Sequence, residues 1–372
     1  MILYLYHFET IDYEQRFVKI GIIDNATSVI WVKRFYDVGE FEIYVKATPE
    51  LFSLLGTLNG DQYAMQDEIF ITRDESNVMM YVEKVKLNTN AENGDYITIS
   101  GRSIECCMDW RVISRRVFSS AETTAESIIR EVVDSTLIFR GSRQGALIWL
   151  QLGEEHDWPD YITRQFTGKK VLDIVKELCV SYSYGFEMVY EENPEDVECI
   201  TFNLYKGTDR SFTQNINPYV VFSPDFENLG DTEYSHDITE LETGALVGGE
   251  GEGDSRTFVW VDPPTNNPFK RRYNYIDARS SSSDGMTTDQ YKTMLQNQGQ
   301  ENIDQRKAVT FFNGEILNYN NYTYGVDYNL GDKVSIVNAY GIKANATITE
   351  ITEVEDESGY RIIPTFSEWV II

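Results

Sequence analysis

The chain has 372 residues, which is long enough for two to four domains that each bury a core. It carries 60 acidic against 32 basic residues, so its formal net charge is −28, and such a chain repels the phosphates of nucleic acids. Aromatic residues make up 13%, with 24 Tyr, which favours strands and interaction surfaces. The first residues, MILYLYHFETIDYE, lack the basic flank and cleavage site of a signal peptide and predict a strand. No stretch approaches the roughly 20 apolar residues of a membrane span.

Residues 1–102 show a β pattern and form the first predicted domain. Val29–Ala47 contains two β-rich runs, VIWVKRF and FEIYVKA, and Asp37-Val38-Gly39 between them predicts a hairpin. Pro49–Leu58 is apolar at every third or fourth residue, which predicts a short helix or loop turn. Strand patterns then resume up to Ser100.

Residues 103–205 change character and predict an inserted α+β domain. Ser120–Asp134 carries capping residues before apolar positions on one helix face, namely Ile128, Ile129, Val132 and Val133. Thr167–Val180 has the same kind of stripe, with Gly185 as the expected terminator. GFEMVYEE and ECITFNLYKG then predict a hairpin around Asn193-Pro194.

Residues 206–308 predict a region of strands and loops with one surface helix. A glycine-rich stretch, Gly248–Gly253, precedes the strand FVWV, and Thr287 and Gln290 are spaced as a capping box for a helix over Thr287–Arg306. This helix is poor in large apolar residues, so we expect it at a surface or subunit boundary and not in a core. Residues 309–372 form the last β module, which we expect strands from 206–260 to complete.

One β unit occurs twice in the sequence. Asp67–Ser100 and Asp332–Phe366 each contain an Asp, a short strand, a second strand, an acidic turn ending in Gly and a third strand. The Asp-to-Gly spacing is the same in both, because 94 − 67 and 359 − 332 both equal 27. Two related modules in one chain place six similar modules in a ring when three subunits assemble. The repeat therefore favours a tube over an enzyme.

Possible catalytic and metal-binding groups give no specific pattern. The four cysteines, Cys106, Cys107, Cys179 and Cys199, include an adjacent pair and no CxxC, so they predict small buried residues and not a zinc site. Glu250 and Glu252 lie within the glycine-rich stretch and would repel a phosphate, so that stretch predicts a turning or flexible loop. We expect no cofactor.

The acidic cluster Glu154-Glu155-His156-Asp157 has ligand types that suit a metal, but no second His lies within a helical turn, and an exposed acidic loop is the favoured interpretation. His236 beside Asp237 has no serine in a nucleophile elbow, so nothing specific supports a hydrolase. We expect the basic groups Arg111-Val-Ile-Ser-Arg115-Arg116 and Lys270-Arg271-Arg272 to pair with carboxylates within or between subunits.

An ordered set of short strings resembles the siphophage tail-hub family, phage tail proteins related in fold to the baseplate hub of contractile tails. The strings are Trp31 with Arg34-Phe35, Gly39-Glu-Phe-Glu42, Ile97–Arg102 (ITISGR), Arg115-Arg116, Gly249–Arg256 (GEGEGDSR), Tyr275–Arg279 (YIDAR) and Tyr328–Val334 (YNLGDKV). Within them the candidate structural or interface residues are Trp31, Arg34, Gly39, Gly101, Arg102, Arg115, Arg116, Gly251, Arg256, Arg279, Gly331 and Asp332. We expect Gly101 and Gly331 to require positive φ at strand ends.

The resemblance implies a mainly β, multidomain hub in which two related tube-like β-barrel domains flank an α+β insertion. It implies a homotrimer that forms a pseudo-hexameric ring in the virion tail tip, assembled in the host cytoplasm. Implied partners are the distal tail protein, the tail tube protein, the tape measure protein and tail tip or fibre proteins. The chain ends at Trp369–Ile372, soon after the last module, so the wall-degrading regions of other family members are not expected.

Three functions follow from these patterns. The leading one is a structural hub, with an acidic channel that passes DNA without stable nucleic acid binding. A receptor-binding or carbohydrate-binding tail module is an alternative, since exposed aromatics on β proteins often bind sugars. A tail-tip hydrolase that uses acidic residues is the other.

Overall fold

The computed structural model describes all residues except 12–13, 60–61, 66–67, 91–93, 119, 121, 139–145, 192–199, 230–231, 315–321, 340–342, 368–369 and 372. The chain divides into two compact units: residues 1–232 with 313–372, and residues 233–312. The four domains predicted from the sequence stay predictions. Asp67, Asn193-Pro194, Cys199 and Trp369 lie outside the described residues.

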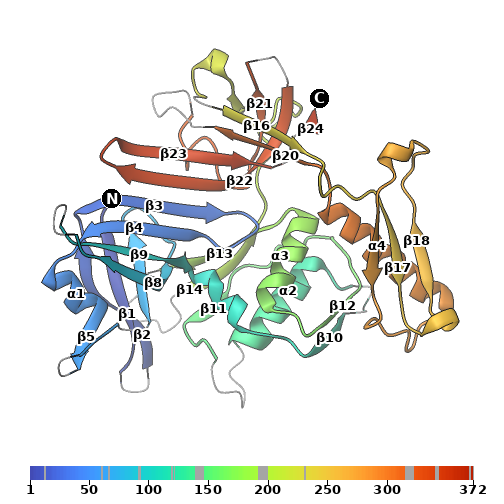
Figure 1. Ribbon diagram of the computed structural model, residues 1–372, viewed down its shortest axis with the longest axis horizontal. Helices are drawn as coiled ribbons and strands as arrows, with labels where there is room; N and C mark the ends of the chain where they lie inside the picture. Colours follow the sequence, from blue (N-terminus) through green and yellow to red (C-terminus); the bar gives the residue numbers. More distant parts are fainter. Residues whose placement is uncertain are drawn as a thin grey trace. The chain divides into compact units, whose positions relative to one another are not determined.

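The first unit is built on a continuous sheet whose strands follow the order β23-β22-β3-β4-β9-β8-β7-β1-β2 (Figure 1). Their bounds are Leu3–Ile11 (β1), Glu14–Ile23 (β2), Ala26–Arg34 (β3), Glu40–Lys46 (β4), Ile69–Arg73 (β7), Met80–Asn88 (β8), Tyr96–Ser103 (β9), Lys343–Asp356 (β22) and Gly359–Phe366 (β23). The predicted hairpin is confirmed as the antiparallel pair β3 and β4. The described pairings form an open path, and the two closed barrels stay a prediction.

Shorter elements complete this part of the first unit. The predicted first helix is confirmed as α1 (Pro49–Leu55), with Thr48 as its N-cap. β5 (Gly56–Asn59) and β6 (Gln62–Met65) form a separate ribbon. β21 (Lys333–Val337) pairs with β22 and with β15 (Val221–Phe222), β24 (Val370–Ile371) also pairs with β22, and one 3₁₀ turn, η3, covers Pro224–Phe226.

The predicted repeat is confirmed in strand order. β7, β8 and β9 form one antiparallel meander, and β21, β22 and β23 form the other. The turn before the third strand has a glycine with positive φ in both copies, at Gly94 (+83°) and Gly359 (+110°). Each middle strand also has a β-bulge opposite the same step of the third strand, Ser100-Gly101 in one copy and Thr365-Phe366 in the other. Matching bulges at matching positions are a shared design of the two modules.

The predicted α+β insertion is confirmed. Helices α2 (Ala125–Val133) and α3 (Val171–Tyr182) pack on a sheet in the order β11-β14-β13. The other elements are η1 (Ile104–Trp110), β10 (Arg115–Phe118), η2 (Asp134–Ile138), β11 (Leu150–Leu152), β12 (Arg164–Thr167), β13 (Gly185–Tyr190) and β14 (Ile200–Tyr205). β13 and β14 are antiparallel, as predicted.

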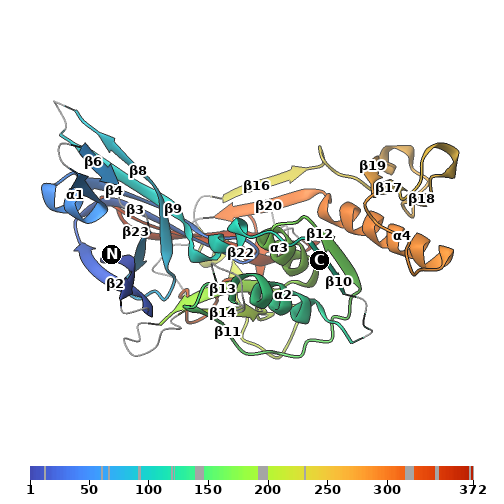
Figure 2. The same cartoon turned by 90° about the horizontal axis from the view of Figure 1, so that it is seen from below.

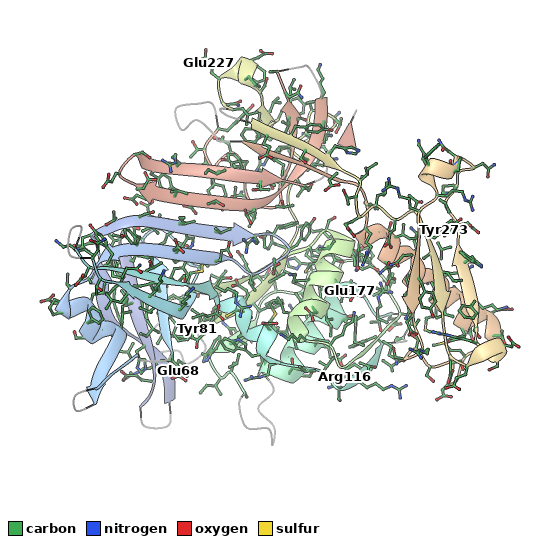
Figure 3. All side chains as sticks on the ribbon, viewed as in Figure 1. Glu68, Tyr81, Arg116, Glu177, Glu227 and Tyr273 are labelled. Carbon is green, nitrogen blue, oxygen red and sulfur yellow. The ribbon has the colours of Figure 1, made fainter. Side chains whose placement is uncertain are left out.

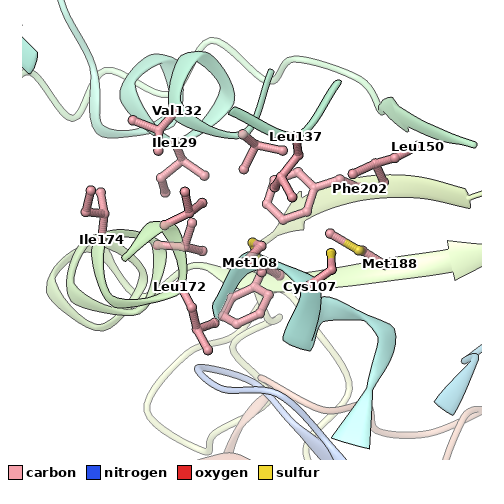
Figure 4. Close-up of a cluster of buried hydrophobic side chains, with 14 of the residues drawn as sticks. Cys107, Met108, Ile129, Val132, Leu137, Leu150, Leu172, Ile174, Met188 and Phe202 are labelled. Atoms are coloured by element: carbon pink, nitrogen blue, oxygen red, sulfur yellow. The ribbon is translucent and has the colours of Figure 1, made fainter. Parts of the chain in front are cut away.

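Apolar side chains from both helices and from the sheet meet in one core (Figure 4). The predicted stripe of α2 is buried, and Thr124 and Ser127 form its capping box. Helix α3 ends at Ser183, whose φ is +55°, and not at Gly185, which begins β13. Cys106, Cys107 and Cys179 are buried free thiols in this core, as expected.

The second unit is a small sheet covered by a helix. Its strands are ordered β18-β17-β19, with bounds Gly244–Gly248 (β17), Phe258–Val261 (β18) and Tyr273–Asp277 (β19). Figure 2 shows α4 (Thr288–Gln305) alongside these strands. Two 3₁₀ turns, η4 (Gly253–Ser255) and η5 (Pro268–Lys270), lie between them, and β16 (Thr232–Asp237) and β20 (Val309–Gly314) lead into and out of the unit.

The prediction that α4 stays out of a core is wrong, although its capping box is confirmed. Tyr291, Leu295, Gly299 and Ile303 form a stripe that packs on the sheet. Gly299 permits this approach, because a Cβ there would lie 2.7 Å from a methyl group of Val261. The buried face of α4 thus depends on the regular spacing of a few apolar residues and on one small residue, and not on many large apolar side chains.

The glycine at the first bulge is a sharp test of the repeated module. A Cβ at Gly101 would lie 1.9 Å from the Tyr81 carbonyl oxygen, whereas a Cβ at Gly94 meets no atom within 4 Å. The expected positive φ is found at Gly331 (+91°) but not at Gly101, where the constraint is this close approach. We expect Gly101→Ala to lower the free energy of unfolding by about 3 kcal/mol. Gly94→Ala, which only strains a left-handed residue, costs about 1 kcal/mol.

The measurement is denaturant unfolding of both variants and the parent chain. Equal losses in the two variants would show that the strands can move apart at little cost, so that the close approach to Tyr81 does not require glycine at position 101.

Candidate assembly site

The second module joins the rest of the sheet where β22 pairs with β3, and β3 is connected through β4 to β9 of the first module. β3 and β22 are antiparallel, and the register places Arg34 opposite Glu350 and Trp31 opposite Glu353. The strands come from opposite ends of the chain, so this pairing joins the modules into one sheet. We call it the seam, defined as residues 29–34 of β3 and residues 350–355 of β22.

Arg34 connects β3 with β22 and β4 on one face of the seam. Its guanidinium donates to Glu350 at 2.6 Å, to Glu40 at 2.7 Å and to the carbonyl oxygen of Val38 at 3.1 Å. The side chains of Arg34 and Glu350 are each about a quarter exposed. Charged pairs directly across a sheet add modest stability and fix register.

The other face of the seam holds a buried charge cluster. Glu353 is 2% exposed and accepts from Arg73 of β7 at 2.6 Å, while the Lys33 amine lies 3.5 Å away. The Tyr360 hydroxyl also donates to Glu353. Burial lowers the pKa of Lys33, and the Glu353 charge opposes that shift. One carboxylate therefore bonds with β7, β3 and β23 together.

The sheet has an open edge along β8. β7 covers only its start, through Met80 and Tyr81, and in the described part of the chain no other strand pairs with that edge. In the second module the equivalent outer half of β22 is covered by β3. Leu87 on the open stretch is 45% exposed. The two modules thus have the same fold, but the edge that β3 covers in the second module is uncovered in the first.

Backbone direction along β8 follows from alternation. Ser103 of β9 donates its backbone N–H to the carbonyl oxygen of Gly39, on the β4 side. Because the backbone groups of successive residues point alternately to the two neighbouring strands, those of Ser100 and Thr98 point to β8. The backbone N–H and C=O groups of their partners, Lys84 and Lys86, therefore point to β9. Val85 and Leu87 alternate with these two lysines along β8, so their N–H groups point to the open edge.

The polar face of the sheet carries charges of both signs. A hollow of about 520 Å³ on this face is lined by Glu40, Glu42, Glu83, Lys84, Arg102 and several uncharged residues. Arg102 makes a two-pronged contact with Glu83, 2.8 Å for each bond, and lies 3.4 Å from Asp109. The acidic channel expected from net charge stays a prediction, and this face alone does not supply it.

Several predicted residues lie in the seam or near it. Trp31 is fully buried beneath the sheet. The Gly39 N–H donates to the Ser103 hydroxyl at 2.7 Å, and a Cβ at Gly331 would collide with the Phe35 ring. Asp332 is 2% exposed and accepts from the Thr208 and Asn329 N–H groups and from Arg210.

The remaining predicted residues lie apart from the seam. Gly251 has a φ of +107° and turns the loop after β17, and Arg256 and Arg279 both contact Asp277, each at 2.6 Å. Arg115 and Arg116 are exposed on β10, with Arg116 labelled in Figure 3. Among the described residues neither of these two forms an ion pair, and their predicted pairing with carboxylates stays a prediction. In the second basic group Arg271 does pair, with Asp262 at 2.8 Å.

The acidic loop at 154–157 is exposed, as expected, but one of its residues is anchored. Among the described residues, no group of three His, Cys, Asp or Glu side chains is placed to hold a metal ion, at His156 or elsewhere. The His156 backbone N–H donates to Glu126 at 2.8 Å, and its ring stacks on Trp158 at 4.4 Å. Glu126 is 1% exposed, so it holds the loop on α2.

Sequence reasoning missed the buried charges that matter most here, Arg73 and Glu353. They are 280 positions apart, and one more acidic residue in a chain with 60 is not informative. A usable signal was the position of Glu353 in a strand pattern, two residues after the buried Ile351 and so on the same, inward face.

Comparisons with known proteins agree with this fold. A tail protein from Neisseria meningitidis is 9% identical, with 98% of this chain and 96% of that chain covered and a TM-score of 0.54. The 43 kDa tail protein of prophage MuSo2 from Shewanella oneidensis is 10% identical, with coverage of 99% and 98% and a TM-score of 0.55. The fold is therefore that of phage tail proteins.

A family model described as Siphovirus ReqiPepy6 Gp37-like protein matches residues 12–366. The chain belongs to that siphovirus family, which confirms the resemblance found in the sequence. No curated protein matches. Within the described residues, no helix has the length and apolar character needed to cross a membrane.

The buried cluster gives a stability prediction for the seam. Glu353→Ala leaves Arg73 buried without its partner, so we expect the free energy of unfolding to fall by about 3–5 kcal/mol. Glu350→Ala removes a partly exposed partner of Arg34 and should cost no more than about 1 kcal/mol. Denaturant unfolding measures both. Losses of equal size would mean that solvent reaches the cluster.

Proposed function

We propose that this protein is a structural hub of a phage tail, a homotrimer whose six β modules form a pseudo-hexameric ring. The single observation that carries the proposal is the repeat with its unequal edges. Among the described residues of one chain, β3 covers the outer half of β22, while no strand covers the equivalent stretch of β8. Membership of a siphovirus family and the fold of tail proteins support this assignment.

Three chains provide a simple closure for the open edges. A strand of a neighbouring subunit takes beside β8 the place that β3 takes beside β22, so each subunit closes its neighbour's edge. Equivalent contacts repeated around an axis give a closed ring, and closure removes the hazard of exposed strand edges. The hub joins the tail tube to the tail tip, and DNA passes through its centre.

The partners in this proposal are other tail components: the distal tail, tail tube and tape measure proteins, and tip or fibre proteins. The protein acts in the tail tip of the virion after assembly in the host cytoplasm. It holds DNA weakly, because a trimer carries three times the formal charge of −28.

The proposed role needs no catalysis. His156 Nδ1 lies 3.2 Å from Glu126 and its ring stacks on Trp158, so both contacts anchor the loop. We expect purified protein to leave peptidoglycan and casein intact, with or without divalent metals. Metal-dependent cleavage that disappears in His156→Ala would instead establish the hydrolase.

The open edge predicts which variant blocks assembly. Leu87→Pro removes an N–H that points to the open edge and leaves the β9 pairing intact, so we expect monomers. Leu87→Ala keeps that N–H and is the matched control, which should remain trimeric. The parent trimer has three times the 42.9 kDa chain mass, about 129 kDa.

Light scattering after size-exclusion chromatography gives these masses, and far-ultraviolet circular dichroism confirms that each variant is folded. A folded parent chain that stays monomeric at high concentration would contradict the ring. A parent trimer that Leu87→Pro leaves intact would place the subunit contact elsewhere.

A further inference from the structure

The sheet of the second unit has one face packed on α4 and another that carries exposed aromatic rings. Ala245, Val247 and Val259 point to the helix. The alternate positions on β18 and β19 are aromatic and lie on the opposite face. Their exposed fractions are 47% for Phe258, 56% for Trp260, 40% for Tyr273 and 48% for Tyr275.

Two of these rings form a right-angled corner. The rings of Trp260 and Tyr273 have centroids 5.5 Å apart and an angle of 88° between their planes. The central strand β17 separates the two rings. Its Gly244 pairs with Tyr273, and its Leu246, two residues further on, pairs with Trp260. A Cβ at Gly244 would lie 2.6 Å from the Tyr273 ring, so only glycine leaves space for this arrangement.

Polar groups fix one wall of the corner and leave one acceptor available. The Tyr273 hydroxyl donates to Asp262 Oδ1 at 2.5 Å, and Arg271 donates to the same oxygen at 2.8 Å. The Arg271 guanidinium lies over the Tyr273 ring, 5.5 Å from its centroid. Asp262 is 59% exposed, and the described residues supply no hydrogen bond to its Oδ2. The carboxylate is therefore held in place with a second oxygen directed to an incoming donor.

A neutral sugar has the chemistry that matches this corner. A pyranose ring presents C–H groups on its faces, which pack on the negative face of an aromatic ring, and hydroxyl donors around its rim. The free carboxylate oxygen accepts such a hydroxyl in a charge-assisted hydrogen bond. Residues 233–312 contain 13 acidic and eight basic residues, a net charge of −5, which disfavours an anionic polymer.

We propose that the corner formed by Trp260, Tyr273 and Asp262 binds a neutral hexopyranose unit of a polysaccharide. This activity goes beyond the structural role of a hub. It gives the second unit a function of its own: attachment to a surface glycan while the first unit forms the ring. Because Trp, Tyr and Arg also predominate in protein hot spots, a protein partner is the rival occupant.

The test uses the full chain and a panel of neutral polysaccharides: dextran, laminarin, galactomannan and arabinogalactan. Affinity electrophoresis in gels that contain each polymer measures retardation. The polymer-induced change in tryptophan fluorescence that is lost in Trp260→Ala measures contact with that ring. We expect at least one polymer to retard the parent chain. Trp260→Ala and Asp262→Asn should each weaken that binding at least tenfold.

Phe226→Ala is the matched control, because it removes a ring that is 51% exposed but lies in the first unit. Its binding should equal that of the parent. The proposal is overturned if no polymer of the panel retards the folded parent chain. It is also overturned if Trp260→Ala binds as the parent does, or if the corner binds a tail protein and no polymer.

Discussion

The pairing of β3 with β22 is the constraint on which the first unit depends. It joins strands from the two ends of the chain, and its register brings Arg34 to Glu350 on one face and Glu353 to Arg73 on the other. A buried carboxylate is tolerated only where donors surround it, so this register has a strong penalty against slipping by one residue. Because the pairing is specific, two similar modules become one sheet with a defined direction and a defined open edge.

That open edge links structure to the proposed assembly. Exposed strand edges invite pairing with another chain, and proteins either protect them or use them. In this chain β3 covers the edge of β22, whereas no described strand covers the equivalent edge of β8. In the proposed ring, subunits would close one another's edges and the wall would be a continuous sheet. The polar face of the sheet carries charges of both signs, exemplified by the pair of Arg102 with Glu83.

Much of the local structure could be predicted from the sequence, because it depends on neighbours along the chain. The hairpin of β3 and β4, the capped helix α2 and the repeated meander all follow from short-range pattern. Long-range packing could not be predicted in this way. Glu353 pairs with Arg73, which is 280 positions away in the sequence. Helix α4 packs on its sheet through residues that include Tyr291 and Gly299. Position 101 requires glycine because the carbonyl oxygen of Tyr81, on another strand, lies so close. The aromatic corner likewise depends on strand register, which places Gly244 beside Tyr273.

Electron cryomicroscopy of the purified assembly tests the central claim most directly. The account predicts a threefold ring in which six copies of the meander lie in one layer and β8 of each subunit pairs along residues 84–88 with a strand of its neighbour. A ring in which β8 stays unpaired, or an assembly whose two meanders lie in different layers, would contradict it.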